Sequence, residues 1–161
     1  MTIKVGDRLP EATFRAMTAE GPQVRATDDV FKGRKVVLVA VPGAFTPTCS
    51  MNHVPGYLEH HAAFKDKGVD AIVVTAVNDP FVMGAWEKAL GNEGKLEFVA
   101  DGSAEFARAI GLELDGSGFG LGIRSKRYAM IVEDGVVREI AVEEAPGKAE
   151  TSGAQAILAK L

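Results

Sequence analysis

The chain has 161 residues, of which 47% are hydrophobic and 25% are charged, and its formal net charge is −4. These averages are typical of a globular domain and exclude a disordered tail, a collagen-like fibre and a disulfide-stapled miniprotein. The negative net charge argues against nucleic-acid binding, which depends on neutralising phosphates with lysine and arginine.

Three further features bear on the expected location. No run of 18 apolar residues is present, so we expect no membrane-spanning segment. Residues 1–7 lack the basic and then apolar character of a signal peptide. The single cysteine, Cys49, cannot form a disulfide within the chain. Together these features predict a cytoplasmic protein.

The first clear elements along the chain form a strand–helix–strand unit. Residues Lys35–Val41 and Asp70–Val77 are short, continuous, β-branched runs, typical of strands that are buried on both faces of a parallel or mixed sheet. Apolar residues at near-helical spacing between them predict a helix from Thr46 to about Lys67. This order predicts a βαβ unit.

Helices and strands continue to alternate along the rest of the chain. Asp79 is a good N-cap before Pro80 and predicts a helix that ends at Gly91. The other predicted elements are a strand over Leu96–Ala100, a helix capped by Ser103 and ending at Ile110, a loop over Asp115–Gly122, strands over Arg127–Glu133 and Val136–Val142 joined by a type I′ turn at Asp134-Gly135, and a helix over Thr151–Leu161. The pattern predicts one α/β domain over residues 1–161.

The segment after the first buried strand, Val41–Ser50, is the best candidate for a reactive site, because ligands of open α/β sheets bind where a strand gives way to a helix. With Thr46 as N-cap and Pro47 as the first helical residue, Cys49 is the third. The helix dipole and unpaired backbone N–H groups stabilise a thiolate there, and the Thr46 hydroxyl can reach toward the sulfur. This position indicates a nucleophile; the alternative is a small, inert core cysteine.

A thiolate also needs a nearby cation, and residues 124–127 (Arg-Ser-Lys-Arg) offer three before a predicted strand. An arginine at the start of this strand could point to the same end of the sheet as Cys49. The alternative is a solvated basic cluster.

Two other features are weaker candidates. His53 lies four residues after Cys49 and could act as its base in acyl transfer, but we expect a surface histidine of the helix. The glycines at positions 116, 118, 120 and 122 mimic a nucleotide-binding loop, yet no strand directly precedes them and no P-loop lysine follows. We expect a flexible loop that could line a pocket.

Three motifs, in the same order along the chain, resemble the peroxiredoxin family. Pro42-x-x-x-Thr46-x-x-Cys49 resembles the peroxidatic motif, and its context over Val41–Cys49 is similar to the type II (peroxiredoxin-5) subfamily. Residues 77–86 (VNDPFVMGAW) and 124–128 (RSKRY) also resemble that subfamily. The resemblance covers nearly the whole chain.

The resemblance implies a thioredoxin-like fold with a central mixed sheet flanked by helices and an N-terminal extension. It implies reduction of hydrogen peroxide and alkyl hydroperoxides without metal or haem. By the family pattern Cys49 is the peroxidatic nucleophile, which becomes a sulfenic acid. Thr46 would hydrogen-bond the peroxide, Arg127 would orient peroxide and thiolate, and Pro42 would shield the sulfur. Arg127 is preferred to Arg124 because the family's arginine immediately precedes the aromatic residue that opens the strand.

One departure from the family pattern concerns the reductant. Relatives often carry a resolving cysteine in the strand predicted over Asp70–Val77 or near the final helix, where this chain has Val74 and Thr151. The sulfenic acid would therefore be resolved by an external thiol: glutathione, alone or with glutaredoxin, is the first choice and thioredoxin the second. The resemblance also implies a homodimer, for which Trp86 and its helix are a possible interface.

Two other functions compete with the one-cysteine peroxidase. A hydrolase or transferase would use Cys49 with His53 as base, so that His53→Ala would abolish activity, whereas the peroxidase should largely tolerate this change. A thioredoxin-like redox-sensing or binding module would be oxidised at Cys49 without turnover. The motifs favour the peroxidase over both.

Overall fold

The computed structural model describes residues 2–161, with the side chains of all of them except Cys49 and Met51. The strands are β1 (Thr13–Thr18), β2 (Gly21–Ala26), β3 (Lys35–Val41), β4 (Ala71–Ala76), β5 (Glu97–Ala100), β6 (Glu113–Asp115), β7 (Ile123–Ser125), β8 (Tyr128–Glu133) and β9 (Val136–Val142). The helices are α1 (Thr27–Phe31), α2 (Val54–Glu59), α3 (His61–Asp66), α4 (Pro80–Ala89), α5 (Glu105–Ala109) and α6 (Ala154–Leu158), with a π-helical turn η1 (Cys49–His53) and a 3₁₀ turn η2 (Ser117–Phe119).

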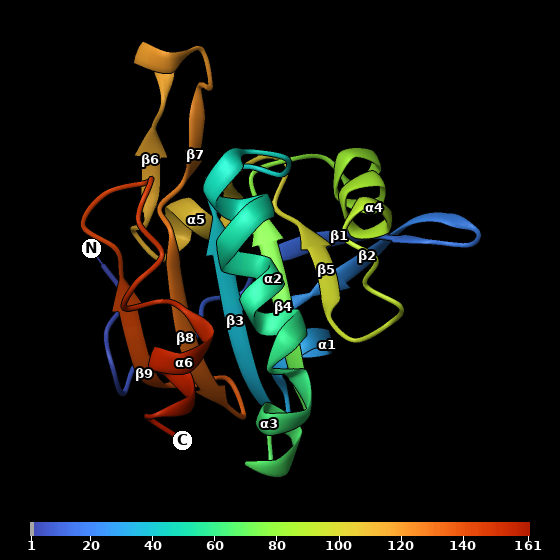
Figure 1. Cartoon of the computed structure of the whole chain (residues 1–161). Helices are drawn as coiled ribbons and strands as arrows, with labels where there is room; N and C mark the ends of the chain where they lie inside the picture. Colours follow the sequence, from blue (N-terminus) through green and yellow to red (C-terminus); the bar gives the residue numbers. More distant parts are fainter. Residues whose placement is uncertain (1) are drawn as a thin grey trace.

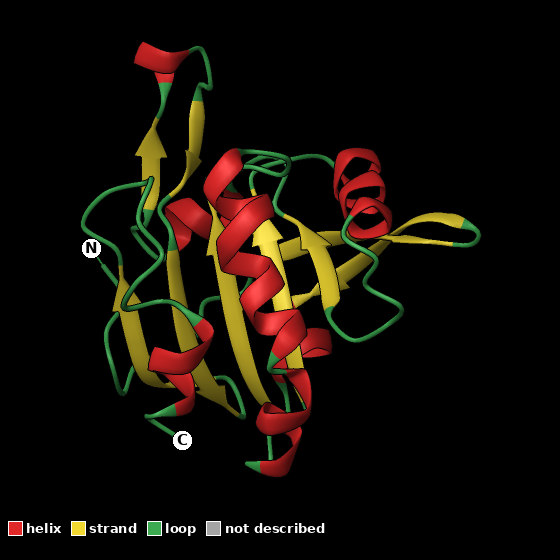
Figure 2. Ribbon diagram, viewed as in Figure 1, coloured by secondary structure: helices red, strands yellow, loops and turns green. Residues whose placement is uncertain are grey.

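Seven strands form one mixed sheet in the order β2-β1-β5-β4-β3-β8-β9 (Figure 1). The central strands β3, β4 and β5 are parallel, and all other pairings in this sheet are antiparallel. Helices cover both faces of the sheet (Figure 2). The hairpin of β6 and β7 stands apart from the sheet and projects beyond one end of it. The predicted α/β architecture, with a mixed sheet flanked by helices, is therefore confirmed.

The central strands are apolar throughout because they supply two hydrophobic cores, one on each face of the sheet. Alternate residues of β3, starting from Val37 and from Val36, enter opposite cores. The first core lies under α2, α3, α4 and α6, and the second lies under α1 and α5. Burial on both faces explains why sequence patterning identified β3 and β4 so directly.

Other predicted elements are also confirmed. The βαβ unit is present, with β3 and β4 as parallel neighbours. Asp79 caps α4, and its carboxylate accepts a hydrogen bond from the Val82 amide at 2.8 Å. Asp134 and Gly135, with φ of 48° and 77°, form the turn of the β8–β9 hairpin. Only φ > 0 at both central residues gives the type I′ turn, which suits the twist of the two strands.

Two predictions about local structure are wrong. Ser103 does not cap α5, because the buried Asp101 carboxylate accepts from the Phe106 and Ala107 amides at 3.0 and 2.9 Å instead. The C-terminal helix is only Ala154–Leu158, because residues 151–153 form a turn before it. The predicted loop over Asp115–Gly122 is present from Gly116 onward, but the short strands β6 and β7 beside it were not predicted.

The helical segment after β3 begins at Pro47, as predicted, and then widens into the π-helical turn η1. Pro55, near the start of α2, follows this turn. A proline ring inside an α-helix clashes with the carbonyl four residues earlier, and a wider turn relieves that clash. π-helical turns inside α-helices are frequent at functional sites.

Candidate functional site

Three of the four residues predicted to form the site line one groove. Pro42, Thr46 and Arg127 lie in the walls of a groove of about 440 Å³ beyond the carboxyl end of β3. The other lining residues are Pro47, Thr48, Leu114, Asp115, Gly116, Phe119, Leu121, Pro146 and Gly147. Most of these side chains are apolar, so the groove places an apolar wall beside the polar groups of Thr46 and Arg127.

The start of the helical segment orients Thr46. Its carbonyl accepts the Ser50 amide at 3.0 Å, which is the first helical hydrogen bond after Pro47. Its hydroxyl donates to the Gly43 carbonyl at 2.7 Å. Since a hydroxyl has one proton, Thr46 presents acceptor lone pairs to other partners in this arrangement.

Cys49 is the third residue of the same helical segment, as predicted. Its side chain lies outside the described part of the structure, so its role as nucleophile stays a prediction. The segments around it are well fixed: the Ala44 amide donates to Asn78 Oδ1 at 2.9 Å, and the Trp86 indole donates to Ser50 Oγ at 2.9 Å. The first bond joins the loop after β3 to the segment before α4, and the second joins the helix start to α4 itself.

Arg127 is buried, with only 2% of its surface exposed, and lies immediately before β8. Its Nε donates to the Pro146 carbonyl at 3.0 Å, and its Nη1 donates to His53 Nδ1 at 2.9 Å. These two bonds fix the guanidinium plane where it lines the groove. The structure thus brings an arginine of the 124–127 cluster to the helix start, as predicted.

Arg124 belongs to the same basic cluster but has a different environment. Its side chain is half-buried, Nε donates to the Leu121 carbonyl at 2.9 Å, and Nη1 donates to the Pro42 carbonyl at 3.3 Å. Lys126 is exposed. Among the three cations, the alternative of a solvated basic cluster therefore applies only to Lys126.

The expectation of a surface His53 is wrong. The residue is 2% exposed, because the π-helical turn and the segment before α6 enclose it. A guanidinium can only donate, so Nδ1 accepts from Arg127 and the ring proton is on Nε2. That proton is donated to the Ser152 carbonyl at 3.0 Å, with Ser152 Oγ also 3.2 Å away. Both ring nitrogens have partners, so the imidazole is not poised as a base for Cys49.

Burial keeps His53 neutral: desolvation lowers the pKa of its imidazole from 6.5 to about 4, and the nearby positive charge of Arg127 acts in the same direction. Behind it, Glu143 accepts from both the amide and the hydroxyl of Ser152. Burial alone would raise the pKa of the Glu143 carboxyl, but the Ser152 hydrogen bonds hold it below its ordinary value.

No motif in the sequence indicates this network. Ser152 and Glu143 carry no motif of their own, and the bond from His53 to Ser152 joins residues 99 positions apart. The available signal was the spacing of His53 and Tyr57. Residues four apart share a helix face, and Tyr57 is one of the apolar residues whose near-helical spacing predicts the helix after Thr46. The Tyr57 hydroxyl also donates to the Ser152 carbonyl.

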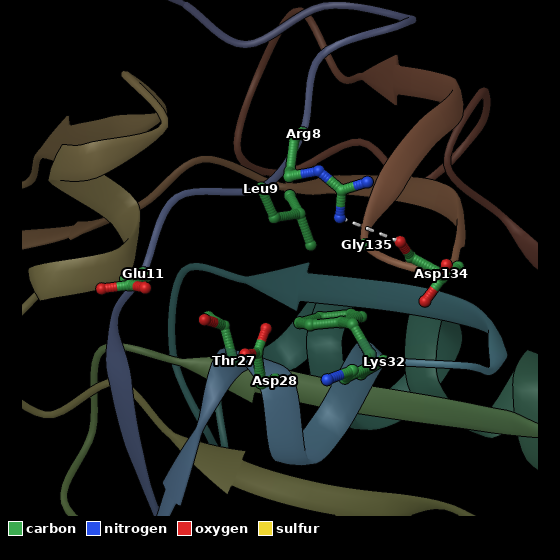
Figure 3. A pocket seen from close by; sticks show the side chains of 9 residues that line it. Arg8, Leu9, Glu11, Thr27, Asp28, Lys32, Asp134 and Gly135 are labelled. Carbon is green, nitrogen blue, oxygen red and sulfur yellow. Dashed lines mark hydrogen bonds between the residues drawn. The ribbon is translucent and has the colours of Figure 1, made fainter.

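Another hollow lies at the opposite end of the sheet, between α1 and the β8–β9 turn (Figure 3). Its lining mixes cations and anions, including Arg8, Lys32, Asp28 and Asp134, and Arg8 donates to the Asp134 carbonyl at 3.2 Å. These opposite charges favour no single ligand. Within the described residues, no group of three His, Cys, Asp or Glu side chains could hold a metal ion, and no helix is long and apolar enough to cross a membrane.

Comparison with known proteins gives the family. The Redoxin family model matches residues 4–158. Peroxiredoxin-2B of Arabidopsis thaliana is 45% identical over 160 residues, which cover 99% of this chain and 98% of the relative. Reduced Prx3 from Vibrio vulnificus in complex with H₂O₂ is 49% identical over 99% of each chain, with a TM-score of 0.93. Peroxiredoxin 5 from Alvinella pompejana is 39% identical, covers 98% of this chain and 96% of its own, and has a TM-score of 0.86. The predicted thioredoxin-like fold is confirmed, and the chain belongs to the peroxiredoxin family, in its type II (peroxiredoxin-5) group.

Proposed function

We propose that this chain is a one-cysteine peroxidase whose nucleophile is Cys49 and whose reaction site includes Pro42, Thr46 and Arg127. Its family indicates reduction of peroxides at the expense of a thiol. The observation that carries the proposal is that Pro42, Thr46 and Arg127 line one groove beside the helix start that holds Cys49.

The proposed reaction is a two-electron transfer from sulfur to the peroxide. The Cys49 thiolate attacks the terminal oxygen of a hydroperoxide; the S–O bond forms, the O–O bond breaks, and the leaving oxygen takes a proton to become water or an alcohol. The product at Cys49 is a sulfenic acid. Alignment of sulfur and both oxygens is required, together with groups that stabilise negative charge on the leaving oxygen.

The groups along the groove match those requirements. The Arg127 guanidinium, fixed by its bonds to His53 and Pro146, supplies positive charge. Thr46 donates its own proton to Gly43, so its oxygen is suited to accept the O–H of a hydroperoxide. The Pro42 ring is apolar and excludes water from this end of the groove. The apolar wall supports alkyl hydroperoxides as substrates beside hydrogen peroxide.

Resolution of the sulfenic acid by an external thiol follows from the presence of one cysteine in the chain. A first thiol would form a mixed disulfide with Cys49 and release water, and a second would free the Cys49 thiol and leave as a disulfide. Glutathione, alone or with glutaredoxin, is our first choice, because a small thiol can enter a groove of about 440 Å³. Thioredoxin is second, because it must fit its own surface against the groove.

The test uses the fluorescence of Trp86, the single tryptophan, whose indole bonds the residue after Cys49. Reduced protein is mixed with sub-stoichiometric hydrogen peroxide in a stopped-flow instrument, beside Cys49→Ser and Arg127→Ala. Intact mass with a sulfenic-acid trap identifies the product. We expect oxidation many orders faster than that of free cysteine, lost in Cys49→Ser and slowed roughly a hundredfold or more in Arg127→Ala. Oxidation no faster than free cysteine and indifferent to Arg127 would contradict the proposal and favour a redox-sensing module.

The reductant is tested on the protein after oxidation. Peroxide-treated protein is mixed with glutathione, with glutathione and glutaredoxin, or with reduced thioredoxin, and the return of the Cys49 thiol is followed by mass. Faster recovery with glutathione than with thioredoxin supports our first choice. The reverse order would assign the reduction to thioredoxin.

We also propose a homodimer, whose interface includes the start of α4, the helix of Trp86, but not the Trp86 side chain itself. Trp86 is fully buried and packs edge-on against Phe98, so its side chain is not an interface residue. Phe45 and Phe81 are 53% and 65% exposed, and the Ala44–Asn78 hydrogen bond brings the loop of Phe45 close to the start of α4, where Phe81 lies. Exposed aromatic groups this close together mark an association surface. Light scattering should show a dimer that Phe81→Asp converts to monomer; a wild-type monomer would contradict this.

The expected location and domain organisation stay predictions. A single domain is supported by the fact that strands from residue 13 to residue 142 share one sheet. Curated relatives include proteins named as chloroplastic and mitochondrial. Fractionation of cells that make this protein would test the cytoplasmic location.

A further inference from the structure

The β6–β7 hairpin forms one wall of the groove, although it is not part of the main sheet. Its tip is folded on itself, because the Gly116 amide donates to the Gly122 carbonyl at 2.7 Å and the Leu121 amide donates back to Gly116 at 3.0 Å. At its root, the Lys126 amide donates to the Leu112 carbonyl at 2.8 Å. The hairpin is therefore bonded within itself and joined to the rest of the domain at this root.

The Arg124 side chain provides a further contact. Arg124 lies directly opposite Leu114 in the hairpin register, so both side chains leave the same face, and Leu114 lines the groove. One guanidinium nitrogen bonds the Leu121 carbonyl inside the hairpin, and another bonds the Pro42 carbonyl in the loop after β3. The planar fork of a guanidinium suits two fixed acceptors at once.

The chain leaves space for this bridge at Gly43. A Cβ atom at position 43 would lie 2.7 Å from Arg124 Nη1, closer than real contacts allow. The loop backbone and the guanidinium therefore pack directly on each other. Arg124 connects the loop that carries Pro42 with the hairpin that carries Leu114, Phe119 and Leu121.

We propose that Arg124 is a positioning residue that sets the distance between the two walls of the groove, and so determines how well the enzyme uses hydroperoxides with an apolar organic group. The proposal rests on the peroxidase function proposed above. Hydrogen peroxide has no organic group to bury, whereas the ring of an aryl hydroperoxide would lie between the loop and the hairpin. Phe119, which is 87% exposed, is the hairpin side chain with most surface to cover such a ring.

The experiment measures second-order rate constants for oxidation of the reduced full-length protein by cumene hydroperoxide and by hydrogen peroxide. The readout is the ratio of the two constants, which a general loss of folding or reactivity does not change. In Arg124→Ala we expect this ratio to fall roughly tenfold, the effect of losing burial for about one aromatic face. Lys126→Ala removes a charge from the exposed side of the same segment and serves as the matched control, with an unchanged ratio.

Two further variants test the bridge itself. Arg124→Lys keeps the charge but not the planar fork, so the ratio should stay low; full rescue by lysine would overturn the two-point contact. Phe119→Ala should also lower the ratio, and the double variant with Arg124→Ala should fall no further than the more affected single variant, because both changes act on one wall. Circular dichroism confirms that each variant is folded.

The outcomes separate the two proposals. An Arg124→Ala ratio equal to or above that of the unmodified protein overturns the role of Arg124, even where peroxide oxidation stays fast. Oxidation of the unmodified protein by hydrogen peroxide no faster than free cysteine overturns the peroxidase itself.

Discussion

Acidification should destabilise this protein through His53. The imidazole is buried against Arg127, and its pKa is lowered from 6.5 to about 4 by desolvation and then by the nearby positive charge. Between these two values the unfolded chain binds a proton that the folded protein does not. Stability therefore rises with pH through this window; the contribution of His53 is fully present above pH 6.5 and is lost as pH falls toward 4.

The magnitude follows from the two pKa values, 6.5 in the unfolded chain and about 4 in the folded protein. The full difference corresponds to about 3 kcal/mol, and about 2 kcal/mol of it is lost between pH 7 and pH 4.5. Below about pH 4 the folded protein would hold a protonated ring beside the guanidinium of Arg127, and repulsion between the two charges would disturb this wall of the groove.

Urea unfolding of the reduced protein, followed by far-UV circular dichroism from pH 7 to pH 4.5, measures this loss. His53→Gln is the matched control, because an amide can both accept from Arg127 and donate to Ser152 but does not titrate. The free energy of unfolding should fall by about 2 kcal/mol more in the unmodified protein than in the variant. Parallel pH dependences for the two proteins would refute the buried, neutral histidine.

Two further predictions concern side chains that hold the fold around the site. Asp101→Ala should lower the free energy of unfolding by about 1–2 kcal/mol, because two amides at the start of α5 lose their acceptor. The control Ser103→Ala should change it by less than about 0.5 kcal/mol. Equal effects of the two substitutions in urea unfolding would argue against the Asp101 cap. Trp86→Phe removes the indole bond to Ser50 and part of a buried ring, and should lower the free energy of unfolding by about 1–3 kcal/mol. Unfolding is followed by circular dichroism, because the variant has no tryptophan. Unchanged stability would contradict the buried, hydrogen-bonded position of the Trp86 side chain.

The elements that were predictable from sequence are those in which local chemistry and tertiary environment agree. β3 and β4 are apolar throughout because both faces are covered, and Asp79-Pro80 starts α4 by capping and a fixed φ. The Asp134-Gly135 turn follows from the need for positive φ. Likewise Pro42, Thr46 and Cys49 share one short segment, so their backbone placement was fixed by one strand end and one helix start.

What the sequence did not reveal depends on partners that are distant along the chain. β1 and β2, whose exposed residues alternate poorly, are strands because they pair with each other and extend the sheet at β5. A β-bulge between Ile131 and Val132 sends Val137 and Ala141 of β9 to opposite cores, although simple alternation places them on one face. The burial of His53 depends on Arg127 and Ser152, and the residues next to His53 in the sequence do not indicate either contact.

The hydrogen bonds that Arg127 makes to two neutral groups have a chemical consequence. A buried guanidinium is usually matched by a carboxylate, which satisfies its donors but also cancels much of its charge. Here two donors go to a carbonyl and to a neutral imidazole, and the Glu143 carboxylate bonds Ser152 behind His53. These two bonds hold the geometry of the guanidinium without cancelling its positive charge. A group that must stabilise a thiolate and a developing alkoxide needs that combination, because a directly paired carboxylate would oppose both. Replacing His53 by an acid should therefore keep Arg127 in place yet slow peroxide oxidation, whereas glutamine, which bonds without charge, should preserve more of the rate.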